Sequence, residues 1–363
     1  MEKNRLLSID ALRGFDMMFI MGFAGIITST CALFPGGENC FLAAQMEHVA
    51  WNGLSFMDTV FPLFLFISGM TFPFSYSGRL SKGATKGQVF LITLRRGCIL
   101  FLLGLVYNGI FKLEPDFRIP SVLARIGLAW MAAAWIYMVC NRKWLRVLIG
   151  LLILLGYHLL LLFPAPDAAS AGSLSLEGNI VGYIDRVLIP NHLYIKGVFD
   201  PEGLLSTLPA IVTAMLGQFT GEFVRTSEKS HKTLRMLADA AILLLAGLLW
   251  SRWLPLNKSL WNSSFVLVVG AYSIALFAIF YWLIDVKGYT RWTGFFSVIG
   301  LNSITIYMAQ QIIPFQEIGE FFFGGLAGLL PEAWGRWLVS LAYFAVCWLF
   351  LFFLKKKQIF LKV

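Results

Sequence analysis

Apolar runs of about 20 residues recur along the whole chain, and they constrain its fold more than any other feature. A run of this length, wound as an α-helix, matches the hydrocarbon thickness of a lipid bilayer. The chain is 58% hydrophobic and 13% charged, which is more apolar surface than a soluble domain of 363 residues needs. We therefore predict an all-α polytopic membrane protein, built as a bundle of transmembrane helices.

The apolar pattern divides into ten predicted spans. A further segment, 312–336, is apolar but broken by Gly and Pro, and it raises the count to eleven if it crosses the membrane. The spans cover residues 10–33, 56–76, 89–111, 120–140, 145–163, 204–223, 236–253, 263–284, 294–311 and 337–354.

The distribution of Lys and Arg predicts the topology. Basic residues are concentrated in alternate connections and in both tails, which by the positive-inside rule places the N-terminus and the C-terminus in the cytoplasm. The net charge of +9 therefore belongs mostly to the inner rim of a membrane protein and does not indicate a nucleic-acid partner. We expect residues 1–363 to form one transmembrane domain, in which the outer loop 164–203 contributes to an extracytoplasmic site.

The five cysteines do not predict a metal site, because no pair has the spacing of metal ligands. Cys31 and Cys40 both lie near the predicted outer face, where an oxidising compartment would allow a disulfide. Whether they form one is left open by the sequence.

Ionisable residues at membrane depth mark candidate functional positions. Asp58 and Arg125 both begin about a turn inside the predicted outer boundary, so we expect them to pair as a structural ion pair between two helices. On the inner side, Arg13 and Arg96 lie within helices and could bind phosphates through their guanidinium groups. The positive-inside rule alone also explains most of the inner basic residues.

Polar residues also converge on the predicted outer face. His48 stands at the entrance to the second span, and the long outer connection adds further polar side chains, which a surface loop rich in charges would also explain. Besides His48, the candidates are Asn52, Asp185, His192, Asp200 and Glu202.

Several stretches resemble the heparan-α-glucosaminide N-acetyltransferase family. They occur in order along nearly the whole chain, and they are long and chemically unusual. They read HVAWNGLSFMDTVFPLFLFISG (48–69), RIPSVLARIG (118–127), GYIDRVLIPNHLY (182–194), FDPEGLLSTLPAIVTAMLGQFTG (199–221) and GLNSITIY (300–307), and the opening SIDALRGFD is similar to the first core helix of the family.

The resemblance implies a membrane enzyme that transfers an acetyl group from cytoplasmic acetyl-CoA to an amino sugar or glycan on the far side. It implies that His48 is the catalytic histidine, because it precedes the Trp-Asn-Gly motif by three positions. It also implies homodimerisation and, for a bacterial-type member, a place among the lipids of the inner membrane. On this reading Arg13, Arg96, Asn302 and Ser303 bind the acetyl-CoA, and Asn52, Asp185, His192, Asp200 and Glu202 hold the acceptor.

A histidine suits this chemistry in either of two ways. A neutral imidazole can remove the proton from the acceptor ammonium group, or His48 can attack the thioester and carry the acetyl group itself. The sequence does not separate these routes. Asp58 follows His48 by about three helical turns, so we expect it to be too far away to orient the ring through a shared helix.

Two positions depart from the family pattern. Ala24 stands where the family pattern has an asparagine, and Gln310 stands where it has a histidine. These changes leave the chemistry of His48 in place but bear on which acceptor is used.

Two other functions fit parts of the sequence. A sugar transporter would also have about ten spans and buried charges, although the two halves show no convincing internal repeat. An O-acyltransferase of cell-surface polysaccharides has a similar Asp-x-Leu-Arg-Gly opening, but the residues around His48 favour the N-acetyltransferase.

Overall fold

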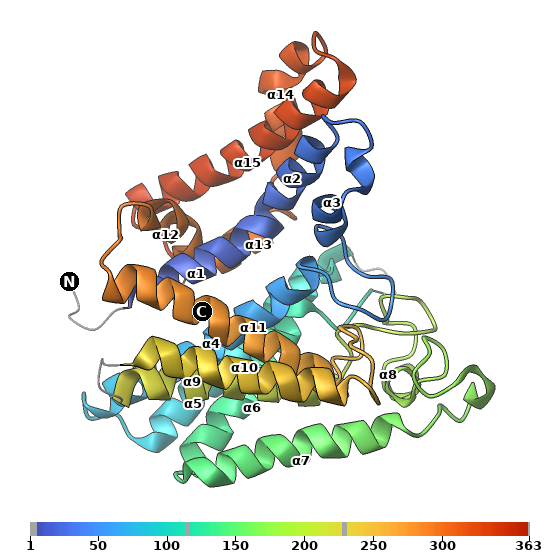
Figure 1. Ribbon diagram of the computed structural model, residues 1–363, viewed down its shortest axis with the longest axis vertical. Helices are drawn as coiled ribbons and strands as arrows, with labels where there is room; N and C mark the ends of the chain where they lie inside the picture. The colour runs from blue at the N-terminus through green and yellow to red at the C-terminus, as the bar shows by residue number, and fades with distance from the viewer. Residues whose placement is uncertain (1–5, 113–116, 227–230, 362–363) are drawn as a thin grey trace. The chain divides into compact units, whose positions relative to one another are not determined.

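The computed structural model describes residues 6–112, 117–226 and 231–361, and within these ranges every regular element is a helix (Figure 1). Two isolated β-bridges, Pro164 with Asn179 and Ile195 with Phe199, are the strand-like pairings of these ranges. Among the described residues, eight helical segments are long and apolar enough to cross a membrane, namely Leu7–Cys31, Met57–Leu80, Lys86–Tyr107, Val122–Val139, Lys143–Leu161, Lys232–Trp250, Ser263–Val286 and Glu332–Lys356. The all-α class is therefore confirmed over the described ranges, and the eight apolar helices support a membrane protein.

Two of the ten predicted spans differ from these eight. The predicted span 204–223 corresponds to α9 (Thr207–Thr226), which is 20 residues long but carries polar side chains such as Gln218. The predicted span 294–311 is divided at Asn302, whose φ of −126° and ψ of 33° separate α12 (Thr293–Leu301) from α13 (Ser303–Ala309). The count of ten or eleven spans and the N-in, C-in topology stay predictions.

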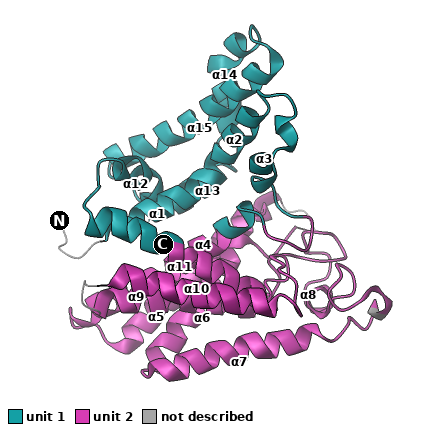
Figure 2. Ribbon diagram, in the orientation of Figure 1, with its two compact units in different colours: residues 1–49, 55–60, 276–362 teal, residues 50–54, 61–275, 363 magenta. Residues whose placement is uncertain are grey.

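The chain divides into two compact units, which Figure 2 shows in different colours. Unit 1 holds residues 1–49, 55–60 and 276–362, and unit 2 holds residues 50–54, 61–275 and 363. In sequence, α4 (Met57–Leu80) and α11 (Ser263–Tyr281) each begin in one unit and end in the other. The single transmembrane domain stays a prediction.

Unit 1 is built on the packing of α1 (Leu7–Met18) against α12. The two helices touch closely, because a Cβ on Gly14 would lie 1.9 Å from the carbonyl oxygen of Phe296. Helix α15 packs against α2 and α14. The other elements of unit 1 are η1 (Phe19–Phe23), α2 (Ala24–Cys31), η2 (Gly37–Asn39), α3 (Phe41–Gln45), η5 (Trp282–Val286), α13, α14 (Phe315–Ala327) and α15 (Glu332–Lys356).

Unit 2 is a second helix bundle, in which α6 packs against α5 and α9. Glycines allow α9 to approach α4 closely, since a Cβ on Gly217 would lie 2.0 Å from the carbonyl oxygen of Phe66. Besides most of α4 and α11, its elements are α5 (Lys86–Tyr107), η3 (Ile110–Lys112), α6 (Val122–Val139), α7 (Lys143–Leu161), η4 (Ala169–Ala171), α8 (Ile180–Leu188), α9 and α10 (Lys232–Trp250).

Candidate active site

A histidine–aspartate pair stands at the start of α4, within unit 1. The Nδ1 atom of His48 lies 2.8 Å from Oδ1 of Asp58. The His48 side chain is 57% exposed, whereas that of Asp58 is 1% exposed. A neutral ring that donates from Nδ1 to this carboxylate carries its lone pair on Nε2, which is the form of imidazole that can accept a proton or attack a carbonyl carbon.

Local sequence explains how Asp58 reaches the ring. The backbone N–H and the hydroxyl of Ser55 both donate to Oδ2 of Asp58, at 3.1 and 2.9 Å. The backbone bond resembles one of the two bonds of a capping box, in which a side chain in the first turn of a helix accepts the N–H of the residue three positions before it. Val49 N–H adds a longer contact of 3.4 Å to Oδ2. These contacts fix the carboxylate on which the His48 ring is oriented.

The expectation that Asp58 is too far from His48 was wrong. It assumed a helix running from His48 to Asp58, but α4 begins only at Met57, and the residues between are non-helical, with bends. Helical spacing therefore does not apply to this pair, and the two side chains meet. The Ser-x-x-Asp pattern at 55–58 was the sequence signal for this arrangement.

Asp58→Asn is expected to lower the rate of the proposed acetyl transfer by about 10²-fold, the lower end of what general acid–base catalysis contributes, with the binding of acetyl-CoA retained. An asparagine can keep the shape of the carboxylate, but its NH₂ group cannot accept the Nδ1–H and so favours the wrong tautomer of His48. Steady-state rates of the purified variant, with a parallel binding measurement, check this. A rate equal to wild type would show that Asp58 does not orient the ring.

The Trp-Asn-Gly motif after His48 is held by loops of unit 2. Trp51 Nε1 donates to the carbonyl of Leu174 at 2.8 Å, and Asn52 Oδ1 accepts from Asn257 Nδ2 at 3.1 Å. Gly53 has a φ of +129°, a conformation that favours glycine. The Gly53 N–H also donates to the carbonyl of Leu256 at 2.8 Å. Each of the three residues of the motif is therefore held by a hydrogen bond to another loop of unit 2.

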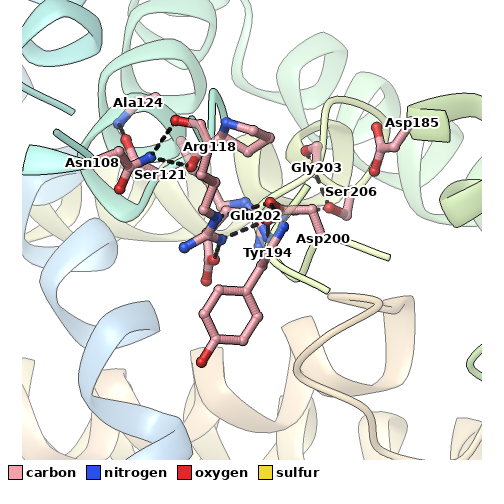
Figure 3. A network of polar contacts seen from close by, with 12 residues as sticks. Asn108, Arg118, Ser121, Ala124, Asp185, Tyr194, Asp200, Glu202, Gly203 and Ser206 are labelled. Carbon is pink, nitrogen blue, oxygen red and sulfur yellow. Dashed lines mark hydrogen bonds and ion pairs between the residues drawn. The ribbon is translucent and has the colours of Figure 1, made fainter. Parts of the chain in front are cut away.

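Two predicted acceptor residues form an ion-pair network with Arg118 in unit 2, which Figure 3 shows. The Arg118 guanidinium donates to both oxygens of Asp200, at 2.8 Å from Nε and 2.6 Å from Nη2, and it also donates to Glu202. The fully buried Asp200 carboxylate accepts two backbone N–H groups as well, those of Tyr194 and Glu202, both at 2.8 Å. The arrangement fixes the loop before α9 through four donors on one carboxylate.

His192 is hydrogen-bonded to the segment that carries Arg118. Its Nδ1 lies 2.7 Å from the carbonyl oxygen of Phe117, and its own carbonyl accepts the N–H of Ile119 at 3.1 Å. The segment that carries Arg118 is therefore joined to the loop after α8 on both sides of that arginine.

Asp185 and Arg125 are buried in unit 2 beside this network. Asp185 Oδ1 accepts the N–H of Leu204 at 2.9 Å, while Oδ2 is buried with no hydrogen-bond partner in the described ranges. Arg125 donates to the Ser206 hydroxyl and lies 4.9 Å over the ring of Trp261.

The predicted ion pair of Asp58 with Arg125 would join residues of the two units, and it stays a prediction. The contacts found for each are different ones, with His48 and Ser55 for Asp58, and with Ser206 and Trp261 for Arg125.

Burial raises the pKa of Asp185 to about 7, with a smaller contribution from the nearby Asp200. Between the ordinary pKa of about 4 and this value, the folded chain holds a proton that the unfolded chain has lost. We therefore expect the Asp185 contribution to the free energy of unfolding to fall as pH rises from about 4 to 7, and to be flat above that range. Asp185→Asn should remove this slope from a series of thermal unfolding midpoints, whereas an unchanged slope would contradict the assignment.

The residues predicted to bind acetyl-CoA are distributed over both units. In unit 1, Arg13 lies 3.9 Å from Asp10 on α1. Asn302 and Ser303 stand at the break between α12 and α13, where Asn302 Nδ2 donates to the carbonyl of Ile359 at 3.1 Å. In unit 2, the Arg96 guanidinium lies 4.3 Å over the ring of Trp130. Their role with acetyl-CoA stays a prediction.

Gln310 and Ala24, the two departures from the family pattern, lie at a distortion of the first span. Residues Phe19–Phe23 form a π-helix, within which Gly22 has a φ of +114°, and Ala24 begins α2 directly after it. Gln310 Nε2 donates to the carbonyl of Ile20 at 3.3 Å and also contacts the Tyr343 hydroxyl. Gln310 therefore supports the backbone at this distortion.

No family model matches the chain. The heparan-alpha-glucosaminide N-acetyltransferases of Homo sapiens and Mus musculus are 27% and 28% identical to it, over 373 and 374 residues. Both alignments cover 86% of this chain but only 54% and 55% of the relatives, so the chain spans about half the length of the curated relatives it matches. The similarity over most of this chain supports its membership of the heparan-α-glucosaminide N-acetyltransferase family.

Proposed function

We propose that this protein transfers the acetyl group of acetyl-CoA to the amine of an amino sugar or glycan across a membrane. The observation that carries the proposal is the pair of His48 and Asp58, in which a buried carboxylate orients an exposed imidazole. The curated relatives, which are named for acetyl transfer to heparan glucosamine, support the same reaction class.

The chemistry can follow two routes from the same geometry. In direct transfer, His48 Nε2 takes a proton from the acceptor ammonium group, and the amine then attacks the thioester carbonyl carbon. The carbon–sulfur bond breaks, the CoA thiolate leaves, and the attacking nitrogen gives its second proton to that thiolate, which yields the amide and the CoA thiol. In the two-step route, Nε2 attacks the carbonyl carbon first and the CoA thiolate leaves, which gives an acetyl-imidazolium. The deprotonated amine then displaces the imidazole, and its remaining extra proton passes to the thiolate. In both, the negative charge of Asp58 stabilises the positive charge that develops on the ring.

We propose the substrates at the level of chemical class. The donor is acetyl-CoA, with Arg13 and Arg96 as candidates for its phosphates, since guanidinium groups bind phosphate oxygens in pairs. The acceptor is an amino sugar or the amino-sugar end of a glycan, with Asn52, His192, Asp185, Asp200 and Glu202 as candidate contacts. Asn52 and His192 carry polar atoms outside the Arg118 network, whereas Asp200 is fully engaged in it.

One assay tests this function. The purified protein in detergent is incubated with acetyl-labelled acetyl-CoA and a panel of glucosamine-type acceptors, and labelled N-acetyl product is measured. We expect at least one acceptor to become labelled. Absence of both acetyl-CoA binding and label transfer, together with sugar uptake by reconstituted vesicles, would contradict the proposal and indicate a carrier.

A further inference from the structure

Cys31 and Cys40 stand at the two ends of a tight loop in unit 1. Cys31 ends α2, and Cys40 directly precedes α3. The Phe34 N–H donates to the carbonyl of Cys31, and the Cys40 N–H donates to the carbonyl of Gly37, both at 3.1 Å. Gly37 makes this return possible, because a Cβ there would lie 1.9 Å from the Cys31 carbonyl oxygen. The turns therefore bring the two cysteines together.

The surroundings of the two thiols are those of a reactive pair. Both side chains are partly exposed, and Cys31 lies close enough to Cys40 to help lower the pKa of the Cys40 thiol. The Ala43 N–H donates to Cys40 Sγ at 3.4 Å, and this bond lowers the pKa of the Cys40 thiol. A thiolate is the form that attacks a disulfide, so Cys40 is the nucleophile of the pair.

We propose that Cys31 and Cys40 form a disulfide that anchors the segment carrying His48. The oxidant is the disulfide of an extracytoplasmic thiol oxidoreductase. The Cys40 thiolate attacks that disulfide, which gives a mixed disulfide and releases one thiol. Cys31 then attacks the Cys40 sulfur and releases the second thiol, so the two protons and two electrons of the cysteines pass to the oxidant. The proposal rests on the predicted N-in topology and is independent of acetyl transfer.

The position of the loop explains why a bond there would anchor the active-site segment. Helix α3 follows Cys40 at once and ends at Gln45, whose Oε1 accepts the N–H of Phe56 at 2.9 Å. Phe56 lies beside the start of α4, and His48 is three residues beyond Gln45. Closing the loop between Cys31 and Cys40 restricts the unfolded forms of this segment and so holds α3 in place.

Counting thiols tests the disulfide directly. Membranes from expressing cells are quenched in acid, denatured and labelled with a maleimide polymer, with and without prior reduction. The chain has five cysteines, so we expect three adducts without reductant and five with it. Cys31→Ser and Cys40→Ser should each give four adducts under both conditions. The matched control Cys98→Ser, at an exposed cysteine outside the pair, should give two adducts and then four.

Two results would overturn the proposal. Five adducts from the unreduced wild-type chain would show that both thiols stay reduced, and a reductant-sensitive pair that persists in Cys31→Ser would assign the bond to other cysteines. Hydrogen exchange tests the anchoring. We expect faster exchange of the backbone amides of 41–48 in Cys31→Ser than in Cys98→Ser, and equal exchange would refute the anchoring. Neither readout depends on acetyltransferase activity.

Discussion

His48→Ala is expected to lower the rate of acetyl transfer by about 10³-fold, because it removes the group that takes the proton of the amine or carries the acetyl group. The side chain is 57% exposed, so its removal leaves no buried cavity, and the variant should fold normally. Steady-state transfer and acetyl-CoA binding are measured on the same preparation. Binding should be retained while transfer is lost.

His158→Ala is the matched control for this variant. His158 lies on α7 in unit 2, where its Nδ1 accepts a hydrogen bond from Trp250 Nε1 at 3.4 Å. We expect this control to transfer acetyl groups at the wild-type rate. If His48→Ala transferred as fast as the control, His48 would not be catalytic.

Arg118→Met is expected to lower the free energy of unfolding by about 3–5 kcal/mol. The substitution keeps much of the side-chain volume but removes the partner of the fully buried Asp200 carboxylate, which leaves an uncompensated charge. Unfolding in the same detergent, followed by helical signal against denaturant, measures the change. Arg118→Lys should recover part of the lost free energy of unfolding, because lysine restores the positive charge but cannot make the bidentate hydrogen bonds of the guanidinium group.

Asp167→Asn provides a matched comparison for Arg118→Met. Asp167 pairs with Arg186 at 2.8 Å, but its side chain is 46% exposed. Exposed ion pairs contribute about 0–1 kcal/mol, so this variant should unfold almost as wild type does. Equal losses from Arg118→Met and Asp167→Asn would contradict the view that burial makes the Arg118 network important for stability.

The sequence was sufficient for the class of fold, because bilayer thickness sets the length of an apolar helix whatever its neighbours are. It was less informative where polar residues interrupt the apolar pattern. Asn302 divides the predicted span 294–311, and the helix that ends at Thr226 is more polar than its neighbours. In the structure, segment 312–336 contains the 13-residue helix α14 (Phe315–Ala327) and the first residues of α15.

The candidate site was likewise predicted only in part. The sequence motif predicted His48, but it did not predict the contact with Asp58, because the residues between them were assumed to be helical. Non-local contacts such as Arg118 with Asp200, which are 82 residues apart, leave no local pattern in a single sequence. Likewise, the sequence offered Asp200 as a carboxylate that could bind a sugar. The structure shows that this carboxylate accepts hydrogen bonds from the Arg118 guanidinium and from two backbone N–H groups.

Acetyl transfer across the membrane is tested most directly in sealed vesicles that hold the reconstituted protein, with acetyl-labelled acetyl-CoA inside and the best amino-sugar acceptor outside. We expect labelled N-acetyl product outside the vesicles with wild-type protein and His158→Ala, and none above background with His48→Ala. Product outside the vesicles at equal rates for wild type and His48→Ala, or no outside product from a wild-type preparation that acetylates the same acceptor in detergent, would contradict this expectation.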